Sequence, residues 1–590
     1  MRLMGALSLA LLLVGCFKPA LEQVDVDVED TAAEDTVMPD VAAETDTPEM
    51  PDSDASPPLD VDAAVDVASP DTDTDVEVVP ECGLDTECTS ISVVPCVVGR
   101  CNAGRCVAVN VSVPCDDGDI CTTSDQCQQG TCRGRAFTEA ESKSWIVRLG
   151  GDGADTVTAV VTHPSGDVSV LGAFEGTMVL PDGASLVSSG GVDGFLVRFT
   201  STGTRVHSVV FGDATSDDAP LHAAGRDEGL AVLWGTRPSD QSTGPSYQAV
   251  LTPRTGTNFA GISVPGFPVA FEVTDTGRMV VVSSIEEEVR IRLASGGEVV
   301  LSPSTGLDGF IAALDGTSAA WVLPIQGLKL GEPSPDWYQK LLFTEQDARW
   351  IATLAPGARV GTTADLVGEN ESADSIWELA LDVELGRVVS STRVSSELNF
   401  VPAASRHLRG ASAVTSYASV GPVAAPTAIV ISGSNRGPDG AERCSAGFEA
   451  ALESDIVFGL FAPTSEGRML MATATSQSAV ALGDSVTLAA GPHLLAVGAY
   501  GADCRALGVV PMVISPFTDR LPKLAALGVA HGFVMLKGGE KGRAFVAGAV
   551  GGVSEPGGPF GASVITTLGS RDGIVGSLGP QALHQCVPAP

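Results

Sequence analysis

The sequence predicts an all-β protein: a seven-bladed β-propeller, preceded by a small disulfide-rich module and a disordered acidic linker. Three observations predict this fold. The 590 residues include 67 glycines but only 5% aromatic and 18% charged residues, a composition typical of turn-rich β proteins. Short apolar strands recur behind glycine-containing turns at intervals of about 60 residues, as in architectures built from repeated small sheets. Nine cysteines cluster just before the repeats.

The first predicted element is a signal peptide at residues 1–15. Arg2 gives it a positive start, and the apolar stretch that follows is too short to cross a bilayer. This stretch ends in Leu13–Cys16 (LVGC), which resembles the bacterial lipobox. The resemblance implies cleavage before Cys16 and acylation of Cys16, for example with palmitate, which would tie the exported chain to a lipid bilayer. The alternative is an ordinary secretory peptide.

The residue after the acylated cysteine bears on the choice of membrane. Lipoproteins retained in the inner membrane usually carry Asp at this position, whereas this chain has Phe17. We therefore expect anchoring in the outer membrane, with the protein facing the cell surface or the periplasm.

An acidic linker is predicted at residues 16–80. Residues 21–80 hold 20 Asp and Glu, about half of the net charge of −39, and no Lys, Arg, aromatic residue or Cys. Such a segment cannot bury enough apolar surface to offset chain entropy, and its like charges extend it. We expect a disordered spacer, with a low-affinity calcium buffer or an adhesive acidic brush as the alternative.

A disulfide-rich module is predicted at residues 81–135. Its cysteines are separated by short polar gaps, and an exported chain enters an oxidising compartment, so we expect disulfide bonds, with a zinc site as the alternative. Three further cysteines follow in the repeat region. The disulfide candidates are Cys82, Cys88, Cys96, Cys101, Cys106, Cys115, Cys121, Cys127, Cys132, Cys444, Cys504 and Cys586.

Residues 114–132 resemble the cysteine-rich repeats of large secreted bacterial proteins, often written CxDGxxCTxxDxCxxGxC. The resemblance implies a small stapled stalk and names no activity. Asp116, Asp117 and Asp119 are candidate Ca²⁺ ligands, although their spacing is not that of a complete EF-hand loop. The alternative is a polar turn between disulfides. No other cofactor is expected.

The repeat domain is predicted at residues 138–590. In each repeat a Gly-containing turn precedes one strand, and an Asp precedes a second strand of four to eight residues. Weaker members lie near Ser246 and Asp503, which brings the count to seven. Packing such sheets radially buries both faces of each, as in a propeller; a β-helix would show shorter rungs and a string of Ig-like domains a longer period. The anchoring residues are Asp193, Asp308, Asp374, Asp455 and Asp572.

The first repeat resembles the bacterial propeller repeats called SBBP. The matching segments are Gly150–Asp155 (GGDGAD), Pro164–Asp167 (PSGD) and Gly191–Phe195 (GVDGF), and the likeness weakens after residue 203. In a propeller, a strand from one terminus usually completes the last blade. We therefore expect residues 145–149 to lie beside residues 572–578.

The expected closeness of the two ends of the repeat domain also bears on which cysteines pair. Cys444 and Cys504 stand in loop contexts of neighbouring predicted blades, so we expect them to pair. Cys586 then remains for a cysteine of the module, which holds an odd number. Which module cysteine is the partner cannot be read from spacing.

Charge and motifs limit the function. A net charge of −39 excludes broad nucleic-acid binding, which needs a basic face. The seven histidines form no metal-binding spacing, and His163 before Pro164 is expected to be a turn residue. The repeated Asp residues are expected to accept backbone N–H bonds and fix turns. The sequence favours a binding or structural module for a protein or glycan ligand, with a polysaccharide hydrolase or lyase as the alternative.

Overall fold

The computed structural model describes residues from 82 to 584 with gaps, the longest of which fall at residues 329–338, 362–374, 514–534 and 555–564. The predicted signal peptide, Cys16 and the acidic linker lie outside the described residues. The chain divides into residues 1–77 and residues 78–590, and the described elements all belong to the second unit. No helix in the described part of the chain is long and apolar enough to span a membrane.

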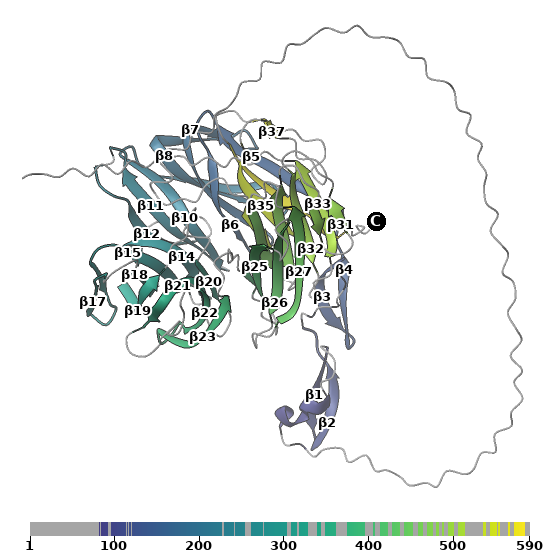
Figure 1. The fold of residues 1–590 in the computed structure, drawn as a ribbon. Coiled ribbons are helices and arrows are strands. Elements are labelled where there is room, and N and C mark those ends of the chain that lie inside the picture. The colour runs from purple at the N-terminus through teal and green to yellow at the C-terminus, as the bar shows by residue number, and fades with distance from the viewer. Residues whose placement is uncertain are drawn as a thin grey trace, which may run out of the picture. The chain divides into compact units, whose positions relative to one another are not determined.

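The described part of the chain is all-β, as the sequence predicts (Figure 1). Its helices are short. They are the 3₁₀ helix η1 (Asp85–Ile91), α1 (Glu139–Ser142) and α3 (Pro580–His584).

The cysteine-rich module consists of two antiparallel hairpins and η1. The hairpins are β1 (Val97–Asn102) with β2 (Arg105–Asn110), and β3 (Thr122–Gln128) with β4 (Thr131–Ala136). Each hairpin turns through two residues with positive φ, Ala103–Gly104 and Gln129–Gly130. This is the geometry of a type I′ turn, whose twist matches that of the paired strands.

The strands in the rest of the described chain fall into antiparallel groups of four along the sequence, and backbone pairing joins some neighbouring groups into eight-stranded sheets. The first three groups are β6 (Thr156–Thr162), β7 (Val168–Val179), β8 (Ser185–Phe199) and β9 (Arg205–Phe211); β10 (Ser216–Arg226), β11 (Gly229–Pro238), β12 (Ser246–Pro253) and β13 (Ile262–Val264); and β14 (Phe267–Val273), β15 (Met279–Ile285), β18 (Asp308–Asp315) and β19 (Ser318–Leu328).

Three further groups continue the pattern. They are β20 (Gln339–Phe343), β21 (Ala348–Val360), β22 (Ser375–Asp382) and β23 (Arg387–Ser395); β24 (Ser405–His407), β25 (Val414–Pro422), β26 (Ala428–Arg436) and β27 (Glu442–Ala451); and β28 (Phe458–Pro463), β29 (Met469–Thr475), β32 (Leu494–Tyr500) and β33 (Ala506–Val513).

Small hairpins are inserted between strands of several groups. They are β16 (Val289–Arg292) with β17 (Glu298–Leu301), β30 (Val480–Leu482) with β31 (Val486–Leu488), and β36 (Val553–Ser554) with β37 (Ile565–Thr566). Such insertions explain why the anchoring residues are unevenly spaced in the sequence.

The last group combines strands from both ends of the domain. It contains β34 (Met535–Gly538), β35 (Ala544–Val550), β38 (Asp572–Leu578) and β5 (Trp145–Gly151). Leu149 pairs with Gly573 and Val147 with Val575, so the predicted pairing of residues 145–149 with residues 572–578 is confirmed. Figure 1 shows the blue β5 among the yellow C-terminal strands.

The interior strands are buried along their length rather than on alternate residues. β15 is buried at every position, and so is β18 except for Asp315. A strand that is covered on both faces reads as a continuous apolar run, which explains why the sequence shows runs and not alternation.

Hydrophobic clusters lie between successive groups and cover those faces. One cluster joins Leu149 of β5 and Phe545 of β35 to Val157 of β6 and Phe174 of β7, so the last group packs against the first. A second joins strands β10–β13 to β14 and β15, and a third joins β15 and β18 to β21 and β22. Because apolar burial is the main favourable contribution to folding, each group depends on its neighbour for stability.

Candidate functional site

The cysteine-rich module is held by disulfide bonds, as predicted. The structure contains Cys82–Cys101, Cys88–Cys106, Cys96–Cys127 and Cys115–Cys132, and the third of these joins the residue directly before β1 to β3. Cys121 is also disulfide-bonded. The zinc alternative is wrong for these nine residues, because sulfurs oxidised to disulfides offer no thiolate to a metal.

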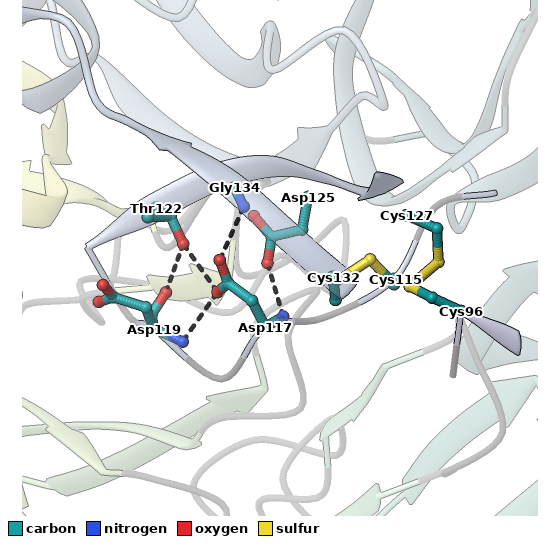
Figure 2. The surroundings of a disulfide bond; sticks show 9 residues. All are labelled: Cys96, Cys115, Asp117, Asp119, Thr122, Asp125, Cys127, Cys132 and Gly134. Atoms are coloured by element: carbon teal, nitrogen blue, oxygen red, sulfur yellow. Dashed lines mark hydrogen bonds between the residues drawn. A yellow bond between two sulfur atoms is a disulfide. The ribbon is translucent and has the colours of Figure 1, made fainter. Parts of the chain in front are cut away.

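An acidic turn lies beside the disulfides (Figure 2). Asp117 accepts hydrogen bonds from the backbone N–H groups of Asp119 (2.9 Å) and Gly134 (2.7 Å) and from the Thr122 hydroxyl (2.9 Å). The N–H of Asp117 in turn donates to Asp125 (3.0 Å). Burial opposes ionisation of Asp117, but these hydrogen bonds outweigh it and lower its pKa.

The described carboxylates of this turn therefore bind their own backbone. Asp119 likewise accepts the N–H of Cys121 at 2.9 Å. This arrangement supports the reading of a polar turn that orders the loop between disulfides. Asp116 lies outside the described residues, and Ca²⁺ binding here stays a prediction.

A cavity of about 610 Å³ opens in the module, which the sequence did not signal. Polar side chains line much of it, among them Asn110, Ser112, Gln128 and Arg133. These groups can both donate and accept hydrogen bonds, so the cavity suits a polar ligand better than an apolar one.

The repeated aspartates have a shared structural role. Asp193, Asp308 and Asp572 are all buried in third strands of their groups. Asp193 accepts the N–H of Ser189 at 2.5 Å, and Asp308 accepts that of Gly327 at 3.2 Å. Both carboxylates accept backbone N–H groups, as expected, but the two donors lie within strands β8 and β19, so the expected fixing of turns stays a prediction.

Two of these aspartates lie against a glycine that is in the next strand or directly follows it. A Cβ on Gly150 would lie 2.2 Å from Cγ of Asp572, and one on Gly212 would lie 2.6 Å from Cγ of Asp193. Gly212 also has a φ of 142°. The carboxylate therefore occupies the space that a side chain would need, which accounts for glycine at both positions.

The other anchors are less uniform. Asp374 and Asp455 lie outside the described residues. The strand that follows Asp374, β22, is the third of its group, as expected. The strand that follows Asp455, β28, is instead the first of its group and lies at an edge. The same sequence pattern, an Asp before an apolar run, thus precedes an interior strand in one group and an edge strand in another.

Asp155 is a buried carboxylate that sequence reasoning missed as a site residue. It accepts the N–H of Gly151 at 2.7 Å. Burial, together with the negative charge of Asp572, raises the pKa of Asp155 to about 7, against the lowering effect of that hydrogen bond. Arg148 lies 3.4 Å from Asp572 and partly offsets the negative charge. This cluster lies where the first and last groups meet.

Asp217 at the start of β10 occupies a comparable position. It accepts the N–H of Val192 in β8 at 3.0 Å and so links two successive groups. Asp155 follows a Gly-rich stretch and directly precedes β6, whereas Asp217 is the second residue of β10 and follows a stretch with one glycine. The burial of both carboxylates depends on residues of other strands.

His163 lies in the turn between β6 and β7, as predicted. Its ring hydrogen-bonds the Ser169 hydroxyl at 2.8 Å, and both residues are buried. Asp167 from the same turn pairs with Arg198 at 2.6 Å. A serine nucleophile must be reachable by substrate, whereas Ser169 is buried. We therefore assign a structural role to this His–Ser pair.

Together the fold and these contacts define an all-β protein with a disulfide-bonded N-terminal module and a propeller-like series of sheets. No family model matches the chain, and no curated protein matches it. Among solved structures, it is similar to the WD40 domain of SCAP from fission yeast, with 9% identity, a TM-score of 0.30, and coverage of 76% of this chain and 98% of that one.

A second solved structure is an acylaminoacyl peptidase of Pyrococcus horikoshii. The identity is 9%, the TM-score is 0.28, and the match covers 68% of this chain. It spans only 58% of the peptidase. Likenesses this distant assign no activity to the chain.

Proposed function

We propose that residues 138–590 form a closed seven-bladed propeller. We divide the described strands into seven groups of four antiparallel strands. We assign β5, which pairs with both β38 and β7, as the outer strand of the seventh group. When the two ends of the domain pair in one sheet, neither the first nor the last sheet of the series is left with an uncovered face, which is the advantage of radial closure. The cluster that packs the last group against the first supports the same arrangement.

We further propose that the protein is an exported lipoprotein, anchored by acylated Cys16 in the outer membrane and spaced from it by the acidic linker. The observation that carries the proposal is the disulfide-bonded module, because stable structural disulfides are typical of exported proteins. The Leu13–Cys16 motif directly after an apolar core supplies the means of anchoring.

The propeller and module then serve to bind or to support an extracellular protein or glycan. Asp193, Asp308 and His163 are engaged in hydrogen bonds within the fold, which favours scaffolding over catalysis. The polar cavity of the module offers hydrogen-bonding groups to a sugar or peptide.

Anchoring is tested with two variants of the full chain. Cys16→Ser should abolish labelling by an alkyne analogue of palmitate and release the protein from the membrane fraction. Phe17→Asp is the matched control: it should keep the label but shift the protein to the inner membrane. Continued labelling of Cys16→Ser would overturn the proposal.

Binding is tested with the unlipidated Cys16→Ser chain, purified with its disulfides intact. Saturable binding on a glycan or peptide array, without turnover, would support a binding module. Release of new reducing ends or unsaturated sugars from a bacterial or plant polysaccharide would instead establish the hydrolase or lyase alternative.

A further inference from the structure

Cys121 is bonded to a cysteine outside the module. Nine cysteines lie between residues 82 and 132, and eight of them form the four pairs within the module. Cys121 is also disulfide-bonded. Its partner is therefore one of the four remaining cysteines of the chain, which are Cys16, Cys444, Cys504 and Cys586.

Cys121 stands at the end of the module that leads into the repeat domain. The next residue, Thr122, pairs with Ala136, the last residue of β4. Phe137 follows and is buried, and Thr138 caps α1 by accepting the N–H of Glu141. Cys121 is therefore next to a residue whose pairing partner, Ala136, lies only three residues before α1.

The C-terminal segment is fastened to α1. The N–H of Gly579, which precedes α3, donates to the Ser144 hydroxyl at 2.9 Å. A Cβ on Gly579 would lie 2.1 Å from the carbonyl oxygen of Ser142, so the two backbones are in close contact. α1 and α3 also pack against each other.

A buried arginine strengthens this junction. Arg543, which directly precedes β35, donates to the carbonyl of Lys143 at 3.1 Å and to the carbonyl of Glu141. It also donates to the Ser577 hydroxyl of β38 at 2.9 Å. Hydrogen bonds of Arg543 and Gly579 therefore hold the segment of residues 141–144, which follows the module, against the strands of the last group.

We propose that Cys121 is joined to Cys586 by a disulfide bond. Cys586 lies two residues beyond the last residue of α3. Measured from Gly579, the five residues of α3 advance about 8 Å and two further residues reach at most about 7 Å, so the chain length leaves Cys586 within reach of α1. A disulfide needs Cα atoms within about 7 Å, which this neighbourhood allows.

The other cysteines favour pairing with each other. Cys444 is the third residue of β27, just after the connection from β26, and Cys504 falls in the connection from β32 to β33. These are equivalent connections, from third to fourth strand, in successive groups. Pairing Cys121 with either one would leave Cys586 to reach the other. Cys16 is committed to its thioether if the proposed lipidation is correct.

The bond forms by oxidation of two thiols. Each thiol loses one proton and one electron, and the two sulfurs join. A disulfide-exchanging oxidoreductase of the export compartment accepts the two electrons and two protons as its own S–S bond is reduced to a dithiol. The product closes a loop of more than 450 residues and ties the module covalently to the last sheet.

Tryptic mapping of the full chain without reduction tests the proposal. Residues 572–590 form one tryptic peptide, and Cys121 lies in residues 106–133. We expect the C-terminal peptide to remain attached to the disulfide-linked module and to be released by reductant. Its attachment to residues 444–468 or 469–505, or its recovery with a free thiol, would overturn the proposal.

Two variants sharpen the test. Cys586→Ser should create one free thiol, at Cys121, and leave the four module disulfides intact. Cys504→Ser is the control and should free Cys444 but not Cys121. A Cys586→Ser chain in which Cys121 stays fully protected from alkylation before reduction would contradict the pairing.

Discussion

Replacing Asp155 with Asn should stabilise the protein at alkaline pH. In the folded protein the Asp155 pKa is about 7, against an ordinary value of 3.8, because the carboxyl is buried beside Asp572. A difference of about three pKa units corresponds to about 4 kcal/mol between the two protonation states. The folded protein bears this cost whenever Asp155 must ionise.

The sign follows from proton linkage. Well below pH 3.8 both the folded and unfolded carboxyl are protonated, and the cost is absent. Between pH 4 and pH 7 the unfolded chain ionises while the folded protein keeps its proton, so the free energy of unfolding falls as pH rises. Above pH 7 the full cost remains. Asn keeps an oxygen for the Gly151 N–H and cannot ionise.

Urea unfolding followed by tryptophan fluorescence at pH 4.5, 6 and 8 measures the effect. Asp155→Asn should unfold close to the wild type at pH 4.5 and be more stable by up to about 4 kcal/mol at pH 8. Asp182→Asn is the control: Arg205 lowers the pKa of this exposed carboxyl, so the change should have the opposite sign and be small. Parallel pH profiles for wild type and Asp155→Asn would refute the reasoning.

Three further changes probe the same contacts. Gly150→Ala should destabilise the protein by about 3 kcal/mol, because its Cβ meets Asp572, and urea unfolding will show it; an unchanged midpoint would contradict the close approach. Arg543→Met should cost a similar amount by leaving the α1 carbonyls unpaired, and thermal unfolding that matches the wild type would contradict this. Asp117→Ala should speed amide exchange at Asp119 and Gly134 about tenfold; unaltered exchange would contradict the turn.

The sequence predicted the repeat of small sheets and the pairing of its ends. Apolar runs behind Gly turns are expected for strands covered on both faces. In a propeller a strand from one terminus usually completes the last blade, so residues 145–149 could be placed beside residues 572–578. The disulfides of the module followed from cysteine density and export, but their pairing did not follow from spacing.

The remaining features depend on contacts that span the chain. Asp155 is perturbed by Asp572, and Arg543 binds α1, each across about 400 residues, and nothing local marks either pair. Asp455 shows why a local pattern misleads: an Asp before an apolar run precedes the edge strand β28 as readily as the interior strand β22.

Cross-linking β5 to β38 tests most directly the claim that the two ends of the repeat domain close it in one sheet. Val147 and Val575 are opposite each other in the register, so cysteines at both positions should form a disulfide that joins the tryptic peptide of residues 144–148 to that of residues 572–590. Cysteines at Val147 and Ile574 are the control, because neighbouring residues of a strand point to opposite faces. The account predicts the first cross-link and not the second; equal cross-linking of both pairs, or of neither, would contradict it.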